Sequence, residues 1–367
     1  MNSKNSLIDR ADTTLLIEQF PLLATSPNGI TNLRELILQL AVRGKLGTQD
    51  ASDEPARVLF DKIKSINQQL VKQDRIRNER PLKEISDSDV PYKIPESWIW
   101  TRLGNIGQIV GGGTPRTSNS DYYVKDGIPW LTPADLYRLK ERFVKRGRRD
   151  ISEIGLSESS AQLLPKGTVL FSSRAPIGYV AIASNSLATN QGFKSCIPFI
   201  MEMSEYIYYF LKAAAIEIDA KASGTTFKEI SGQEMKQILI PLPPLAEQQR
   251  IVQKVDCLMA LCDTLEFQQR KEHESRVLHG TAALTVLLKA KDSEELEKIW
   301  KHLTGNFDGL FDCLENILTL RQTILQLAVR GQLAEQNIDD ESVSDVQEIF
   351  DNTPHSLPEN LTSPEEG

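Results

Sequence analysis

Three short segments of the chain combine hydroxyl groups with cationic side chains between regions of regular structure. Residues 111–118, 172–174 and 223–228 read GGGTPRTS, SSR and SGTTFK. Hydroxyls, backbone N–H groups and cations are the donors that phosphate oxygens require, and arginine can bond guanine bidentately. These segments give as candidate nucleic-acid contacts Thr114, Arg116, Thr117, Ser172, Ser173, Arg174, Thr225, Thr226 and Lys228.

Two further stretches carry the same kind of chemistry. Residues 138–149 hold seven basic residues against one acid, Glu141, so Lys145 and Arg148 are candidate phosphate contacts. Residues 190–193 read NQGF, in which Gln191 would either read a base or belong to a turn that enters a strand. Each signal also has a plainer explanation, because a GGGT segment is often only a turn and a basic run is often a solvated face.

The charge of the chain is unevenly distributed. The net charge is −8, yet residues 95–243 hold 17 Lys+Arg and 14 Asp+Glu, which is +3 and leaves −11 for the remainder. Residues 334–367 contain ten acidic residues and no Lys or Arg. This asymmetry is compatible with a basic binding domain on an acidic scaffold, and equally with an acidic, solvated surface.

Common signatures of catalysis and metal binding are missing from the sequence. There is no GxxxxGK[ST] loop, no GxGxxG after a strand and no GxSxG motif. The four cysteines form no CxxC pair, and the four histidines all lie outside residues 95–244. We therefore expect no catalytic centre and no metal site. With no signal peptide and no long apolar run, a cytoplasmic protein without a membrane segment is expected.

The elements that must position these residues form an α/β domain between helical segments. Short β-branched runs predict strands at 106–110, 127–131, 168–172, 179–183 and 194–198, with a helix at 205–222. An extended, proline-closed run at 238–244 ends this domain. Helices are predicted at 54–75 and, as a hairpin with a charged middle at 289–298, over 276–305. The fold class is thus α+β, with one mixed α/β domain.

A helical segment occurs twice. Residues 33–46 read LRELILQLAVRGKL and residues 320–333 read LRQTILQLAVRGQL, so 11 of 14 positions are identical at an offset of 287. Both copies have helical spacing and a glycine suited to the helix end. A heptad pattern follows residue 245 and predicts packing on a neighbouring helix. The predicted helical packing residues are Leu36, Leu40, Ile251, Val255, Leu258, Cys262, Leu265, Ile324 and Leu327.

Taken together, these motifs resemble the specificity (S) subunit of type I restriction–modification systems. IPESWIWTRLG at 94–104, GGGTPRTSNSDYY, GIPWLTPADL, LPKGTVLFSSRAPIGYVAIA, ATNQGF, SGTTFKEIS and IPLPPLAEQQRIV follow one another in the order typical of that family. The resemblance implies an N-terminal helical region at 1–94, a target-recognition domain at 95–244, a helical spacer region at 245–333 and an acidic tail, partly disordered, at 334–367.

The resemblance also implies a function and partners. Such subunits have no catalytic centre and read a bipartite double-stranded DNA target with two recognition domains held apart by an antiparallel helical spacer. Modification subunits bring S-adenosylmethionine, and restriction subunits bring ATP and Mg²⁺. This chain departs from the pattern, because only one recognition domain is evident, and we therefore predict a homodimer. The alternative is a non-catalytic scaffold or decoy that binds modification subunits without reading DNA productively.

Overall fold

The computed structural model describes residues 26, 28–46, 49–222 and 228–333. Their contacts divide the chain into two units, 1–266 and 267–367. The first 25 residues of the expected N-terminal helical region, the segment containing Thr225 and Thr226, and the acidic tail lie outside the described residues. Over the described ranges, no helix is both long and apolar enough to span a bilayer.

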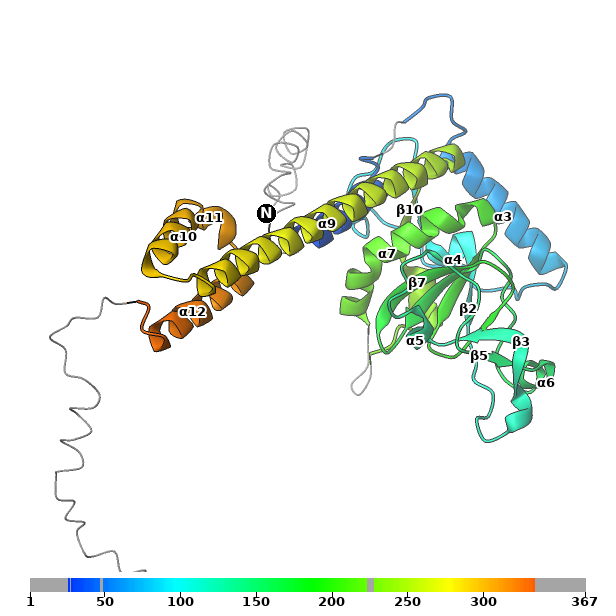
Figure 1. Ribbon diagram of the computed structural model, residues 1–367. Coiled ribbons are helices and arrows are strands. Elements are labelled where there is room, and N and C mark those ends of the chain that lie inside the picture. Colours follow the sequence, from blue (N-terminus) through cyan, green and yellow to red (C-terminus); the bar gives the residue numbers. More distant parts are fainter. Residues whose placement is uncertain (1–25, 27, 47–48, 223–227, 334–367) are drawn as a thin grey trace, which may run out of the picture. The chain divides into compact units, whose positions relative to one another are not determined.

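The first unit contains a mixed α/β fold (Figure 1). Its helices are α2 (Gly29–Val42), α3 (Ala56–Lys72), α4 (Leu103–Ile106), α5 (Pro133–Leu136), α6 (Glu153–Ser157), α7 (Ser204–Lys221), α8 (Gly232–Gln237) and the first part of α9 (Leu245–Leu288). Its strands are β1 (Ile99–Arg102), β2 (Gly107–Gly111), β3 (Tyr123–Leu131), β4 (Phe143–Val144), β5 (Arg149–Ile151), β6 (Val169–Ser173), β7 (Ile177–Ala183), β8 (Ala188–Thr189), β9 (Lys194–Pro198) and β10 (Leu239–Leu242).

The strands form three sheets. The largest has the order β2-β9-β6-β7-β4, antiparallel except that β4 runs parallel to β7. A three-stranded sheet has the order β5-β3-β8, and β1 pairs with β10, with Ile99 opposite Leu242. The strands that were predicted from β-branched runs and turn residues are therefore present, each within a few residues of its predicted limits. Strand β6 is buried along its whole length, which fits a sheet covered on both faces.

Helix α7 covers the five-stranded sheet and joins its core to the flanking helices (Figure 1). Its aromatic residues Tyr206 and Phe210 are buried in one cluster with Phe171 of the sheet and Ile37 of α2. The predicted packing residues of α9 belong to this cluster: Ile251, Val255 and Cys262 are buried, and Leu258 and Leu265 pack against it. The first part of α9 is thereby fixed to the recognition fold rather than exposed.

The second unit is helical. It comprises the last part of α9, α10 (Ser293–Gly305), α11 (Phe307–Leu310) and α12 (Leu314–Val329). The predicted hairpin is present, because α9 ends at Leu288, directly before the charged stretch 289–298, and α10 begins within that stretch at Ser293. Its core contains Leu284, Leu287, Leu303, Phe311, Leu320 and Leu327, with Ile324 packed against it.

Candidate nucleic-acid interface

Four loops of the first unit meet at one edge of the five-stranded sheet. Gly111 at the end of β2 pairs with Lys194 at the start of β9, and Ser173 at the end of β6 pairs with Ile177 at the start of β7. A bridge between Ser172 and Phe193 links the two pairs. The segments after Gly111, before Lys194 and between Ser173 and Ile177 therefore lie together, and we call this place the loop edge. A backbone hydrogen bond of 3.0 Å from Ile230 N to Ser173 O brings the segment after Lys228 to the loop edge as well.

Two of the three glycines at 111–113, Gly112 and Gly113, fix the first loop of this edge. A Cβ on Gly112 would lie 1.9 Å from Asn190 O, and one on Gly113 would lie 2.2 Å from Ala161 N. Gly113 N donates to Thr189 O at 2.9 Å, and its carbonyl accepts from Trp130 Nε1 at 2.9 Å. The two glycines thus permit a close backbone approach that no larger residue allows. The loop is held in place instead of being a loose turn.

Some side chains near the glycine loop are bonded within the loop edge, and others are exposed to solvent. The Thr114 hydroxyl donates a hydrogen bond to the Gln191 side chain, so the structure brings these two predicted contacts together. Arg116 and Thr117 are exposed, and within the described residues the Arg116 guanidinium has no partner. The Asn190 side chain accepts a hydrogen bond from Gly192 N at 2.9 Å, which makes Asn190 part of the turn and leaves Gln191 exposed.

The prediction that Ser172 and Ser173 form an exposed loop is wrong. Both belong to β6 and are 0% exposed. Ser172 Oγ donates to Pro176 O at 2.8 Å and accepts from Tyr179 N at 2.8 Å, so this hydroxyl organises the turn between β6 and β7. Neither serine side chain is at the surface, and Arg174 is the residue of this segment that reaches it.

Cations and carboxylates alternate around Arg174. Glu229 lies 3.5 Å from Arg174 Nη1 and 3.1 Å from Lys194 Nζ, while Lys228 Nζ lies 3.6 Å from Asp219. A hollow of about 560 Å³ is lined by Arg174, Ala175, Pro176, Ile177, Asp219 and Lys228. Ion pairs this exposed contribute little to stability, so the cations can exchange their carboxylates for phosphates at small cost. The predicted contacts Arg174 and Lys228 therefore lie on the same hollow.

Much of the basic run at 138–149 is used within the fold. Arg142 binds Glu205 at 2.6 Å and Asp256 at 2.5 Å, and Arg146 lies 2.9 Å from Asp126. Arg148 lies 3.1 Å from Asp135, yet 75% of its side chain is exposed and still accessible. Burial alone would raise the pKa of Asp135, but hydrogen bonds from Thr132 and Arg148 outweigh it and lower that pKa.

Lys145 is exposed but lies away from the loop edge. It follows Val144, which pairs with Ala183 at the opposite end of β7 from Ile177. A phosphate contact by Lys145 therefore requires a ligand that extends along the sheet.

An aromatic and cationic patch was missed by the sequence reasoning. The ring of Tyr137, which is 59% exposed, lies 6.4 Å from that of Tyr179, and the Arg138 guanidinium lies 5.1 Å from the Tyr137 ring. Tyr179 joins the patch to the loop edge through its bond to Ser172. Exposed aromatic faces with adjacent cations suit stacking and cation–π contacts. The signal in the sequence was the aromatic residue directly before the basic run, in LYRLK at 136–140.

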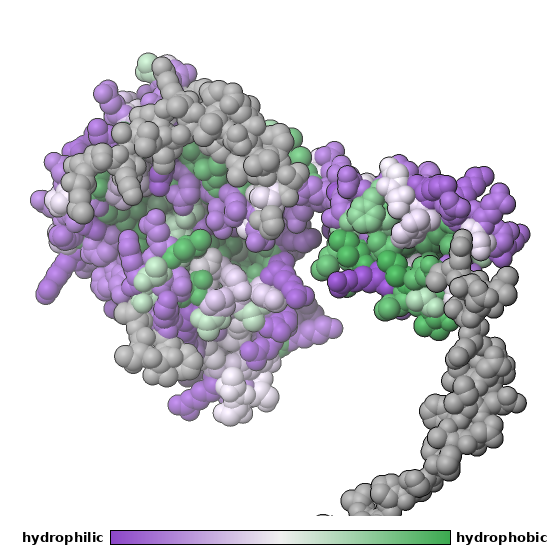
Figure 2. Space-filling model, turned by 90° about the vertical axis from the view of Figure 1, so that its left-hand side faces the viewer, coloured by the Kyte–Doolittle hydropathy of each residue, from purple (hydrophilic) through white to green (hydrophobic). Residues whose placement is uncertain are grey.

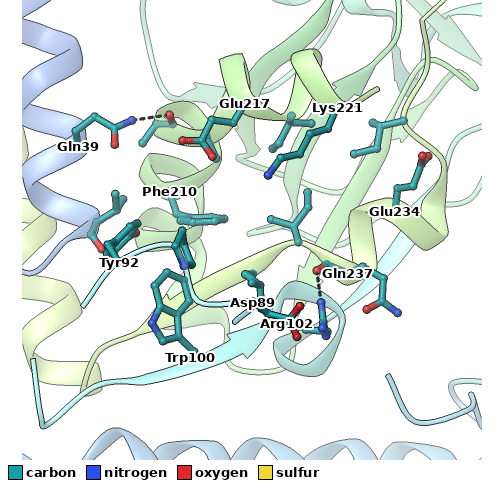
Figure 3. A pocket seen from close by; sticks show the side chains of 18 of the residues that line it. Gln39, Asp89, Tyr92, Trp100, Arg102, Phe210, Glu217, Lys221, Glu234 and Gln237 are labelled. Carbon is teal, nitrogen blue, oxygen red and sulfur yellow. Dashed lines mark hydrogen bonds between the residues drawn. The ribbon is translucent and has the colours of Figure 1, made fainter. Parts of the chain in front are cut away.

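A second hollow, of about 530 Å³, lies between the end of α2, α7 and β1 (Figure 3). Tyr92, Trp100 and Phe210 form its walls, with Glu217 and Lys221 at its rim. Gln39 donates to Ala213 O at 3.0 Å and fixes α2 to α7 beside it. Of its two cations, Arg102 is occupied by the backbone carbonyls of Lys83 and Gln237, and Lys221 lies close to the carboxylate-bearing rim.

Comparisons with known proteins give relatives over most of the chain. Residues 95–274 match the model of the type I restriction modification DNA specificity domain. The chain is 40% identical over 193 residues to the type I restriction enzyme MjaIX specificity subunit of Methanocaldococcus jannaschii, covering 52% of this chain and 43% of that protein. It is 32% identical over 332 residues to the type I restriction enzyme EcoAI specificity subunit of Escherichia coli, covering 87% of this chain and 54% of that protein.

Solved structures give a weaker likeness. The HsdS subunit from Thermoanaerobacter tengcongensis aligns with a TM-score of 0.40 and 21% identity, covering 70% of this chain and 52% of that one. The chain thus spans about half the length of the relatives that it matches.

Proposed function

Because this chain belongs to the type I restriction–modification specificity-subunit family, with its specificity domain at 95–274, we propose that it is a DNA sequence-recognition subunit. It reads one half-site of a double-stranded target with its single recognition domain. It directs modification subunits, and restriction subunits where they are present, to a bipartite site. S-adenosylmethionine, ATP and Mg²⁺ would be bound by those partners, and this chain would supply no catalytic group.

The observation that carries this proposal is the convergence of donors at the loop edge. Arg116 and Gln191 can present fork-like and amide donors to base edges, and Arg174 and Lys228 can bind the backbone. The rigid glycine loop supports this use, because side chains that read bases must be held in a fixed register. The Tyr137–Arg138 patch lies beside these donors and extends the surface that a duplex would contact.

We further propose that two copies of the chain act together. The residues matched to the family contain one recognition domain, while a bipartite target needs two. A two-fold pair would present two identical loop edges and would therefore recognise an inverted repeat. The duplicated helix supports this arrangement, because the same sequence lies on both sides of the recognition domain.

Co-expression with the modification subunits of the same host tests the proposal. Mapping of methylated positions by sequencing should give a two-part, inverted-repeat motif that disappears when this chain is omitted. Light scattering after size exclusion should give twice the mass of the chain. A methylated motif with unrelated halves would contradict the two-fold reading.

Measuring DNA binding by the purified complex distinguishes a DNA-recognition subunit from a scaffold or decoy. Because several phosphates would be neutralised, affinity should fall steeply as salt rises from about 50 to about 200 mM. A complex that binds the modification subunits but gives no salt-dependent DNA binding and no methylated motif would instead be the scaffold or decoy.

A further inference from the structure

The two copies of the duplicated helix bury different faces. In α2 the buried residues include Ile30, Leu38 and Val42, which are 7%, 7% and 4% exposed. The residues 287 positions later in α12 are Ile317, Leu325 and Val329, which are 39%, 67% and 90% exposed. A face that packs into a core in one copy is thus open to solvent in the other. Figure 2 shows the resulting apolar surface on the second unit.

Helix α12 packs through its other face. Leu320, Thr323 and Leu327 are buried, whereas their counterparts in α2, which are Leu33, Leu36 and Leu40, are only partly buried. The repeated sequence therefore has two apolar faces, and each unit uses one of them. This also explains why the predicted packing residues Leu36 and Leu40 are half-exposed.

The surface that receives α2, which we call the α2 seat, makes specific polar contacts as well. Arg34 Nη2 lies 2.6 Å from Asp263 and 2.7 Å from Glu266 of α9, and Gln39 donates to α7 (Figure 3). Gly44, with a φ of 72°, ends the segment against Pro95 and Trp98. These contacts fix the position of α2 along the seat.

Helix α12 and the residues after it carry the same three residue types that fix α2 in its seat. Arg321, Gln326 and Gly331 stand where α2 has Arg34, Gln39 and Gly44. Gly331 has the same backbone conformation, with a φ of 67°, and no atom of the described residues lies within 4 Å of its Cβ position. In the described part of the chain, the side chains of Arg321 and Gln326 have no hydrogen-bond partner. The copies differ only at positions 35, 36 and 45 among the 14, and none of these is a buried residue of α2.

The directions of the helices point to a second copy as the occupant. In the first unit, Arg34 near the start of α2 contacts Glu266, while Asp53 beyond its end pairs with Arg250, so α2 runs antiparallel to the part of α9 that it contacts. In the second unit, Asn316 bonds Arg276 O and Arg330 bonds Leu288 O, so α12 runs parallel to its part of α9. If two copies pair with their α9 helices antiparallel, α12 runs along the partner's α9 in the direction that α2 takes.

We propose that α12 of one copy docks in the α2 seat of a second copy, so that α2 and α12 are alternative occupants of one seat. This inference rests on the proposed pairing of two copies. Docking leaves the buried face of α12 on its own α9 and covers its open face. Displacement of α2 exposes an equivalent apolar face. The total apolar surface that is buried is therefore nearly conserved, and the exchange joins two chains with little net loss of contacts.

Single substitutions on α12 test the exchange in the full-length chain. Leu325→Asp and Val329→Asp should weaken self-association about tenfold or more, as measured by sedimentation velocity over a concentration series. Thermal unfolding should be nearly unchanged, because both side chains are exposed. Leu318→Asp is the matched control: Leu318 is 54% exposed on the same helix, but its counterpart Thr31 is exposed in α2. It should leave self-association unaltered.

Cross-linking between two tagged copies identifies the occupant directly. One copy carries Arg321→Cys and the other Glu266→Cys, both in a background with Cys257→Ser and Cys313→Ser, which removes the two free cysteines that are not buried. A short bismaleimide should join the two different tags. Leu318→Cys in place of Arg321→Cys should give no product. Self-association that is insensitive to Leu325→Asp, or a cross-link confined to one copy when both cysteines share a chain, would overturn the exchange while leaving the pairing intact. A chain that remains monomeric at every concentration would overturn both.

Discussion

The indole N–H of Trp98 donates a hydrogen bond to Oε2 of Glu247 over 2.8 Å, and both side chains are buried. Trp98 directly precedes β1, and Glu247 lies in the first turn of α9. The contact therefore joins the beginning of the recognition fold to the beginning of the long helix that follows its end. Oε1 of the same carboxylate has no hydrogen-bond partner among the described residues, so Glu247 is an incompletely satisfied buried group.

Stability should depend on pH through Glu247. Burial raises the pKa of this carboxyl, and the hydrogen bond from Trp98 and the charge of Arg250 lower it by less. Because the folded-state pKa lies above the unfolded value, stability is greatest below the unfolded pKa, near 4.5, and falls as pH rises through the folded pKa. Glu247→Gln keeps the acceptor for Trp98 and should remove this fall. Urea unfolding at several pH values should show the variant gaining on the wild type as pH rises, and parallel curves would contradict the assignment.

The three adjacent glycines should differ sharply in their tolerance to alanine. Gly112→Ala and Gly113→Ala place a methyl group inside neighbouring backbone and should destabilise the fold by about 1–3 kcal/mol or more. Gly111→Ala is the internal control, because its Cβ would meet only Lys194 Cδ, at 3.9 Å. Chemical denaturation measures the three differences. Equal losses at all three positions would show that the loop is not packed as described.

Lys140 and Arg142 should separate binding from folding within one basic run. Lys140 is exposed and has no ion pair in the described part of the chain, so Lys140→Ala should weaken DNA binding modestly, lower the salt slope by about 1 and leave unfolding unchanged. Arg142→Ala removes charged hydrogen bonds to Glu205 and Asp256 and should cost about 1.5–3 kcal/mol of stability. Binding titrations at several salt concentrations and unfolding of both variants check the pair. The reverse outcome, with Arg142 controlling the salt slope, would contradict it.

Arg116 should control sequence discrimination. If its guanidinium bonds guanine, Arg116→Ala should cost about 1–3 kcal/mol on the cognate site and relax the preference at one position of each half-site. Lys145→Ala is the comparison, since a phosphate contact there would weaken all sequences alike. The measurement is methylation mapping of each variant together with binding to single-base variants of the site. An unaltered motif with Arg116→Ala would remove this residue from base reading.

The sequence predicts the strands and helices well because β-branched runs, prolines and glycines act locally. It does not predict which polar residues remain available. Arg142 is occupied by Glu205 and Asp256, 63 and 114 positions away. Ser173 lies one residue beyond the predicted strand 168–172, yet β6 includes it and it is buried. The duplicated helix shows the limit most directly: α2 and α12 are nearly identical in sequence, yet Leu38 is buried and Leu325 is exposed. Exposure depends on the partner surface and not on the helix itself.

The pairing of β1 with β10 gives the recognition domain the character of an exchangeable cassette. Its first and last strands are paired, with Arg102 opposite Leu239, so the two ends of the domain lie next to each other. Recombination or engineering that replaces residues 103–238 would keep this two-stranded clasp, the Trp98–Glu247 contact and the helices on both sides. Because α7 lies within this span and contacts both α2 and α9, a replacement domain must keep the surface of α7 that Gln39 and Asp256 contact.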